Sequence, residues 1–203
     1  MFIFAVLISL ALGINSFEVY DSGVSVTEQE TIVEAHNNYR LQIANGKVAG
    51  QPRGTNLKRM SWDDTLAVEA QKVADLGKFE HLIAPDDRFP YGYVGQNLYI
   101  SMSTGNSATI NWSGGIKAWF DEHKDFVYGA QTQAGVTGHY TQVVWADTNL
   151  VGCGYVRFYD NVTANIMPAY PYKKLYVCNY GPAGNWVGEN PYETGESGCE
   201  NLC

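Results

Sequence analysis

The sequence predicts an α+β sandwich in which helices pack on an antiparallel sheet. Apolar residues repeat at helical spacing in three segments of the first 124 residues, and strand-like runs dominate from residue 139 onward. Helices that precede a set of antiparallel strands pack against them as separate layers. A chain of 203 residues, 45% of them hydrophobic, is long enough for one such domain and too short for two ordinary ones.

The amino-terminal sixteen residues form a separate segment. They carry no charged side chain, and residues 2–12 are an apolar run too short to span a bilayer. Small residues follow at Gly13 and Ser16. The pattern predicts a signal peptide over 1–16, cleaved after Ser16 or, as a second choice, after Gly13; a buried core helix is the alternative. The polar stretch 17–26 that follows is expected to be loosely held.

Three helices are expected in the first half of the domain. The first begins with a capping box of Thr27 and Glu30 and stops at Gly46. Ser61 caps the second helix, and the third covers residues 113–124. Their inner stripes are Ile32, Ala35, His36, Tyr39 and Ile43, then Leu66, Ala70, Val73 and Gly77, and finally Ile116, Trp119, Phe120 and His123.

Four runs are typical of strands, at residues 94–100, 139–145, 151–159 and 175–180. The link over 147–150 has the length of a hairpin turn. A loop over 81–93 precedes the first strand and contains the aromatic stretch Phe89 to Tyr93. Such side chains can line an apolar ligand groove, although ordinary core or lid packing is their more common use.

The cysteines and two glycosylation motifs agree with export from the cell. Four cysteines, even in number, lie in the last third of the chain: Cys153, Cys178, Cys199 and Cys203. Four cysteines allow three pairings, and disulfides are the default in an oxidising compartment. A zinc knuckle is the alternative, but the chain has no CxxC pair. Asn111 and Asn161 each begin an N-glycosylation sequon.

The charge and the missing motifs argue against several classes of function. A formal net charge of −8 repels phosphate backbones and anionic lipids, so we expect no nucleic-acid partner and no polybasic attachment to membranes. We also expect no membrane span, because no second apolar run follows residue 16. The sequence contains no HExxH, GxSxG or P-loop motif, so the common metalloprotease, hydrolase and nucleotide-binding templates do not apply.

Two segments resemble the signature motifs of the CAP superfamily, which comprises cysteine-rich secretory proteins, antigen 5 proteins and pathogenesis-related 1 proteins. They are Gly138-His139-Tyr140-Thr141-Gln142-Val143-Val144-Trp145 and Val177-Cys178-Asn179-Tyr180-Gly181-Pro182-Ala183-Gly184-Asn185-Trp186. The stretch from His36 to Arg40 is similar to the HNxxR element of the family, and Met60 to Leu66 is similar to the start of its second helix. The sequence Val94-Gly95-Gln96-Asn97 favours the antigen 5 branch of venom and salivary allergens.

The resemblance implies a fold, domain bounds and a disulfide pairing. CAP proteins are three-layer α-β-α sandwiches with a central antiparallel sheet, so such a domain is expected over 28–192, with a short cysteine-containing tail over 193–203. The family also pairs Cys153 with Cys178, which leaves Cys199 and Cys203 for each other. The amino-terminal disulfides usual in antigen 5 proteins have no counterpart in this sequence.

A central cleft with two histidines and two acids is a further implication of the resemblance. His81, Glu122 and His139 match three of these positions, but the fourth, an acid in much of the family, is Gln96. An amide carries no charge and cannot act as a general base. Two imidazoles and one carboxylate can still hold Zn²⁺ with one position open. They can equally form a hydrogen-bonded polar network, and we favour a structural or loosely metal-binding cleft over a catalyst.

Three other polar residues near these motifs have less specific interpretations. His36 lies on the inner stripe of its helix and is expected to be a hydrogen-bonded core histidine rather than a ligand. His123 directly follows Glu122, so the two side chains point about 100° apart on a helix, and His123 is expected to be structural or exposed. Asp121 is expected to be an exposed or capping group.

The function implied by the resemblance is that of a secreted, monomeric protein without enzymatic activity. It would bind a host protein or a small apolar ligand such as a sterol, a fatty acid or an eicosanoid, with no required cofactor. The alternative is a metal-dependent hydrolase that uses His81, Glu122 and His139. Gln96 argues against this alternative, because hydrolysis needs a base in addition to the metal ligands.

Overall fold

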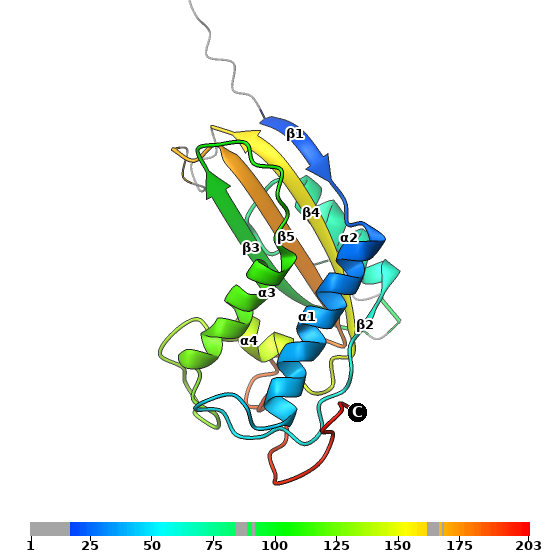
Figure 1. Ribbon diagram of the computed structural model, residues 1–203, viewed down its shortest axis with the longest axis vertical. Coiled ribbons are helices and arrows are strands. Elements are labelled where there is room, and N and C mark those ends of the chain that lie inside the picture. The colour runs from blue at the N-terminus through cyan, green and yellow to red at the C-terminus, as the bar shows by residue number, and fades with distance from the viewer. Residues whose placement is uncertain (1–16, 84–88, 91, 162–166, 168) are drawn as a thin grey trace, which may run out of the picture.

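The fold is a three-layer α-β-α sandwich, as expected (Figure 1). A computed structural model describes residues 17–83, 89–90, 92–161, 167 and 169–203, so the expected signal peptide lies outside the described residues. The elements are β1 (Phe17–Ser22), α1 (Val26–Ala44), β2 (Ser61–Trp62), α2 (Asp64–Asp75), β3 (Gly95–Ser103), α3 (Trp112–Asp121) with a 3₁₀ turn (Glu122–Lys124), α4 (Gly138–Val143), β4 (Leu150–Asp160) and β5 (Tyr172–Gly181).

The central sheet has the strand order β1-β4-β5-β3, with antiparallel neighbours, and β2 adds parallel pairing to the start of β4. Helices α1, α3 and α4 cover one face, and α2 covers the other (Figure 1). Cys153 and Cys178 are directly opposite each other in the β4–β5 register and form a disulfide. A second disulfide joins Cys199 to Cys203, so both bonds follow the expected pairing.

Helix α2 lies very close to the sheet because two glycines of β4 face it. A Cβ atom at Gly152 would lie 2.3 Å from the backbone nitrogen of Ala67, and one at Gly154 would lie 2.4 Å from the backbone of Gln71. Neither contact is compatible with a side chain. The apolar layer around this contact consists of Ala70, Val73, Ala74, Leu98, Val156, Phe158, Leu175 and Val177.

The buried side chain of Arg40 joins α1 to the segment before β2 and to the end of α4 with the residues that follow it. Its guanidinium donates hydrogen bonds of 2.7 to 3.2 Å to the backbone carbonyls of Lys58, Val143, Trp145, Ala146 and Thr148. Burial lowers the pKa of Arg40 to about 9. A charge without water needs such a full set of acceptors, and the result is a rigid link between α1 and the short helix that carries His139.

Both helix caps that the sequence predicted are wrong by two residues. Helix α1 begins with a capping box of Ser25 and Glu28 rather than Thr27 and Glu30. The observed pair has the same three-residue spacing as the predicted pair, and the positive φ of Gly23 allows the chain to turn away from β1 just before Ser25. Asp63, rather than Ser61, caps α2, because Ser61 belongs to β2 and donates its N–H to Asn149.

Two further expectations are wrong because tertiary contacts override the local pattern. Residues 17–22 are not loosely held but form β1, which pairs with β4 at one edge of the sheet, so the sheet begins before residue 28. The run 139–145 is not a strand: it contains α4, and the link over 147–150 is therefore not a hairpin. Every residue from Tyr140 to Trp145 is buried, so its side chains give no reliable period of two.

Candidate functional site

One half of the expected cleft is built on the Glu122 carboxylate. Glu122 follows α3 directly, in the 3₁₀ turn, and its Oε1 accepts a 2.6 Å hydrogen bond from Nδ1 of His139. Its Oε2 accepts from the backbone N–H groups of His139 (3.0 Å) and Tyr140 (3.2 Å) at the start of α4. One carboxylate therefore orients the imidazole and satisfies free N–H groups of a helix.

The other half is a neutral clamp around Gln96 of β3. Its Oε1 accepts hydrogen bonds from Nδ1 of His81 (3.1 Å) and the backbone N–H of Leu82 (3.2 Å). Its Nε2 donates to the carbonyl of Leu82 (2.9 Å) and to Oδ1 of Asn179 (3.0 Å). The amide thus pairs with Leu82 as a neighbouring strand would, and it holds the loop after α2 against the sheet.

A chain of buried polar groups lies beneath the Glu122 half. The ring of His36 donates from Nδ1 to the carbonyl of Ile32 (2.8 Å), and its Nε2 accepts from the hydroxyl of Tyr180 (2.9 Å). Asn97 donates to that same hydroxyl (3.3 Å) and to the carbonyl of His139 (3.1 Å). The expectation of a hydrogen-bonded core histidine at position 36 is therefore confirmed.

Burial sets the protonation states of His36 and Tyr180 in this hydrogen-bond network. It lowers the pKa of His36 to about 4 and raises the pKa of Tyr180 well above its usual value, since either charge would be removed from water. Both groups are thus neutral at physiological pH, which matches a network in which Nδ1 carries the proton of His36. The sequence motifs contain Asn97, Asn179 and Tyr180, but their contribution depends on contacts between distant segments, which no local pattern indicates.

The cleft residues do not form a zinc site in this arrangement. A zinc site needs three or four ligand atoms about 2 Å from one ion. Among the residues that the structure describes, no three His, Cys, Asp or Glu side chains are grouped closely enough to hold a metal ion. His81 and His139 each bond to a partner in a separate half. The set of His81, Glu122 and His139 therefore does not fit a metal as placed, and zinc binding stays a prediction.

The neighbouring polar residues behave as expected. His123 donates to the carbonyl of Phe120 and packs beside the rings of Phe120 and Tyr140, so it is structural. Asp121 forms ion pairs with Lys117 and Lys124 at the surface. Neither contributes to the cleft.

The two candidate glycosylation sites have different surroundings. Asn111 is exposed and caps α3, where its Oδ1 accepts from the backbone N–H of Gly114 at 2.9 Å. Asn161 is also exposed, but residues 162 and 163 of its sequon lie outside the described residues. Glycosylation at both positions stays a prediction.

An exposed aromatic pair lies where the sequence suggested a ligand groove. Of the stretch from residue 89 to 93, Phe89 is buried, residue 91 lies outside the described residues, and Tyr93 is 61% exposed. The ring of Tyr93 meets the ring of Trp186, which is 46% exposed, edge to face at 5.6 Å. Trp186 and the exposed Val187 also line a cavity of about 400 Å³.

Comparison with known proteins agrees with this architecture. The profile of the Cysteine-rich secretory protein family, CAP, matches residues 33–180. "Salivary antigen-5" of Dipetalogaster maximus is 38% identical over 181 residues, which cover 85% of this chain and 68% of that protein. "Cysteine-rich secretory protein 3" of Homo sapiens is 38% identical over 86% of this chain and 65% of its own length. "CRISP/Allergen/PR-1" of Trittame loki is 38% identical over 93% of this chain, but the chain spans about half, 47%, of that relative.

Solved structures show the same fold. Venom allergen-like protein 4 of Schistosoma mansoni superposes with a TM-score of 0.64 at 27% identity, covering 86% of this chain and 97% of that one. The protein NaASP2, solved with Zn²⁺, superposes with a TM-score of 0.67 at 27% identity, covering 88% and 91%. The chain therefore belongs to the CAP family, and the resemblance that its motifs suggested is confirmed.

Proposed function

We propose that this protein is secreted and acts by binding a host factor or a small apolar ligand, without turning over a substrate. Membership of the CAP family supports this, as do relatives that are named for venom and saliva. The apolar, uncharged pattern of residues 1–16 supports export. Within the described part of the chain, no helix combines the length and the apolar character needed to cross a membrane.

The observation that carries the proposal is the division of the cleft into two separately satisfied halves. The carboxylate of Glu122 is occupied by three N–H groups, two of them from the backbone. The imidazole of His81 bonds to Gln96, which cannot accept a proton as a base. A hydrolase needs an activated nucleophile, a proton acceptor and a group that stabilises an oxyanion. The cleft instead has the features of a network that holds loops in place.

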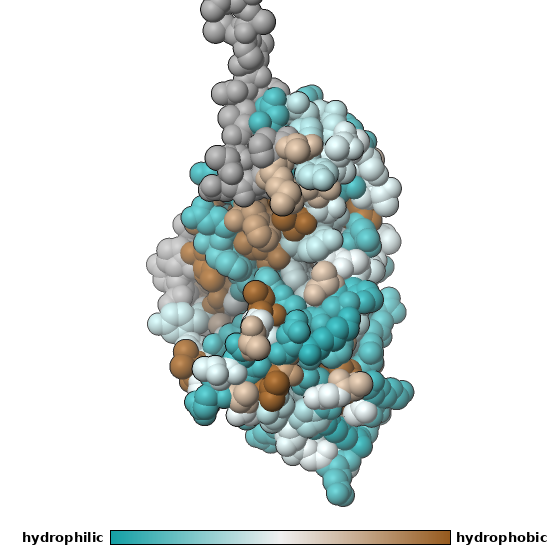
Figure 2. Space-filling model, turned by 90° about the vertical axis from the view of Figure 1, so that its left-hand side faces the viewer, coloured by the Kyte–Doolittle hydropathy of each residue, from teal (hydrophilic) through white to brown (hydrophobic). Residues whose placement is uncertain are grey.

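Exposed apolar side chains support a role in binding. The pair formed by Tyr93 and Trp186 leaves two large rings partly in water, beside the fully exposed Val187. Figure 2 shows the face on the side of α3 and β3, where hydrophobic patches alternate with hydrophilic side chains. Aromatic side chains that stay exposed beside a cavity are typical of binding surfaces. A host protein, a sterol, a fatty acid and an eicosanoid are the ligands that we propose.

Turnover assays separate this proposal from the hydrolase alternative. We expect generic peptide and ester substrates, with Zn²⁺ added, to be hydrolysed no faster than in buffer. The Glu122→Gln variant should give the same background rate. Hydrolysis well above background that disappears in Glu122→Gln would make the enzyme built on His81, Glu122 and His139 the better conclusion.

A further inference from the structure

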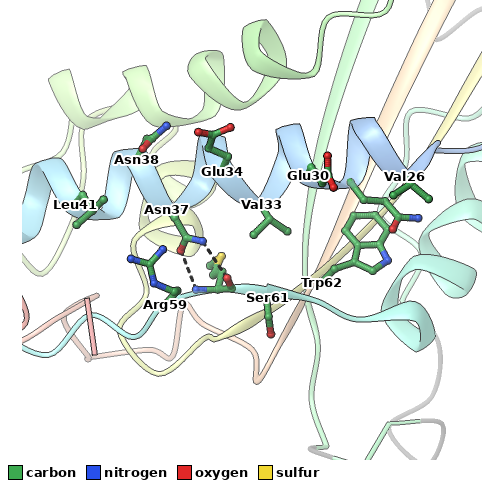
Figure 3. Close-up of a pocket in the computed structure, with 12 residues that line it drawn as sticks. Val26, Glu30, Val33, Glu34, Asn37, Asn38, Leu41, Arg59, Ser61 and Trp62 are labelled. Carbon is green, nitrogen blue, oxygen red and sulfur yellow. Dashed lines mark hydrogen bonds between the residues drawn. The ribbon is translucent and has the colours of Figure 1, made fainter. Parts of the chain in front are cut away.

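A groove lies between α1 and the extended segment 59–62 that leads into α2 (Figure 3), and none of its lining residues belongs to the cleft. Its volume is about 720 Å³, enough for a small organic molecule. Its apolar lining includes Val26, Val33, Met60 and Trp62, and its acidic lining is Glu30 and Glu34. This space is called the α1 groove below.

The α1 groove is held open by fixed contacts on both sides. Asn37 of α1 bridges to the backbone of Met60: its Nδ2 donates to the carbonyl at 2.9 Å, and its Oδ1 accepts from the N–H at 2.8 Å (Figure 3). The N–H of Ser61 donates to Asn149, which ties the same segment to the sheet. A ligand therefore finds preformed walls, and little ordering free energy is lost on binding.

Apolar side chains stay accessible along these walls. Val26 is 69% exposed at the start of α1, and Val33 is only partly buried against the core. Figure 3 shows the indole of Trp62 beneath α1 near Val26. The Nε1 of Trp62 donates to Asp64 at 2.9 Å, which fixes the ring. The walls can thus accept the apolar body of a ligand.

The charged lining of the groove is two carboxylates, Glu30 and Glu34, and one guanidinium, Arg59, so acidic groups outnumber basic ones. Glu30 and Glu34 are one helical turn apart on α1, and two like charges at this spacing destabilise a helix. Within the part of the chain that the structure describes, neither carboxylate has an ion-pair partner. The basic residue of the lining, Arg59, donates to the carbonyl of Asn201 at 3.1 Å, toward the carboxyl-terminal tail. A fatty-acid anion would be repelled here, and a cation would be attracted.

We propose that the α1 groove binds a small organic cation with an apolar body, such as an arylalkyl primary amine. The ammonium group lies at the α1 rim of the groove, nearest Glu30, with Glu34 one helical turn further on, and it offsets the repulsion between the two carboxylates. The aromatic or alkyl body packs against Val33 and Trp62. This site shares no residue with the cleft of His81, Gln96, Glu122 and His139, and it does not depend on the function proposed above.

Three probes of one shape test the charge requirement: 4-phenylbutylamine, 4-phenylbutanol and 4-phenylbutyrate. Titration calorimetry on the purified chain should show saturable binding of the amine. The neutral alcohol should bind about 5- to 10-fold more weakly, as the loss of two partly exposed ion pairs predicts. The carboxylate should bind more weakly still. No detectable amine binding at millimolar concentration, or equal affinities for the three probes, would overturn the proposal.

Matched variants then locate the site. Glu30→Gln with Glu34→Gln should lower the amine affinity about 5- to 10-fold and leave alcohol binding unchanged. Glu189→Gln with Glu196→Gln removes the same net charge from exposed positions elsewhere and should change the affinity by less than about twofold. Thermal melting confirms that both double variants fold. An amine affinity that falls equally in both pairs, or in neither, would place the binding elsewhere or make it a general charge effect.

Discussion

The two halves of the cleft are built on side chains of different chemistry, a carboxylate at Glu122 and an amide at Gln96. At Glu122 a carboxylate accepts from an imidazole and two backbone N–H groups, so the local order depends on a negative charge. At Gln96 an amide both donates and accepts, and it holds a loop through the backbone of Leu82. A carboxylate can only accept, whereas an amide can imitate a strand neighbour. The carboxylate half is therefore held by a charged group and the amide half by a neutral clamp.

Glu122 and Gln96 support different parts of the fold because they lie at different places in it. Glu122 satisfies the amino end of α4, a helix of six residues that is too short to be stable alone. Gln96 lies in β3, already paired with Asn179 in the sheet register, and its side chain reaches outward to the loop. Loss of Glu122 should therefore affect a core element, and loss of Gln96 should affect mainly a loop.

The largest expected effect is on Glu122. Replacement by Ala removes the acceptor of three hydrogen bonds, two of them from half-buried backbone groups, so we expect a loss of about 3 kcal/mol in the free energy of unfolding. Urea denaturation measures this. Asp121→Ala is the matched control, because its exposed ion pairs should be worth less than about 1 kcal/mol. Similar losses in both variants would contradict the structural importance of Glu122.

The next effect depends on pH and concerns His36, which belongs to the buried, neutral hydrogen-bond network beneath the Glu122 half. His36 has a folded pKa of about 4, below the value of 6.5 expected in the unfolded chain. As pH falls below 6.5, the unfolded state gains a proton that the folded state does not. The contribution of His36 to the free energy of unfolding is therefore fully present above pH 6.5 and decreases toward pH 4. Between pH 7.5 and pH 5 the expected loss from this group is about 2 kcal/mol.

Denaturant unfolding across this pH range, with variants, isolates the contribution of His36. His36→Gln removes the titrating ring and should flatten the dependence, even if the variant is less stable throughout. His123→Gln is the matched control for replacing a histidine, because its ring bonds to the carbonyl of Phe120 outside the buried network of His36. A His36→Gln variant with an undiminished decrease between pH 7.5 and pH 5 would show that another group is responsible.

The sequence predicts the layers of the fold better than their edges and contacts. Long apolar stripes locate α1 and α2, and the central strands β4 and β5 are predicted correctly because both are buried runs. The edge strand β1 escapes prediction because its residues are mostly exposed and it is ordered by pairing with β4. Helix α4 has the pattern of a strand because a short, fully buried segment has no informative period.

The candidate site stays a prediction from the family resemblance, and the hydrogen bonds that its residues form could not be predicted from the sequence. The resemblance predicts one cleft that contains four residues, whereas the structure joins them in two pairs. No local pattern could show that the amide of Gln96 would bond to the backbone of Leu82. The α1 groove is beyond sequence reasoning for a similar reason. Its two walls are 18 or more residues apart in sequence, and tertiary contacts such as the bridge from Asn37 to Met60 bring them together.

The smallest expected effect comes from placing a carboxylate at position 96, in the neutral half. In Gln96→Glu the Nε2 donor is lost, and a carboxylate oxygen faces the carbonyl of Leu82 and Oδ1 of Asn179, two acceptors that become unsatisfied. We expect a loss of about 1.5 kcal/mol at pH 7, because a buried acceptor without a partner costs about this much. At about pH 4 a protonated carboxyl regains one donor, so the loss should be smaller there. This dependence distinguishes the clamp from simple loss of packing, which does not vary with pH.

The same variant tests whether the two halves ever act together. If they stay separate, as their hydrogen bonds indicate, Gln96→Glu should leave Zn²⁺ affinity unchanged, because His81 and the added carboxylate would still be apart from Glu122 and His139. Calorimetric titration of both chains with Zn²⁺ measures this. A clear gain in affinity for Gln96→Glu, abolished by His139→Ala, would mean that the two halves close around a shared ion once position 96 carries a carboxylate.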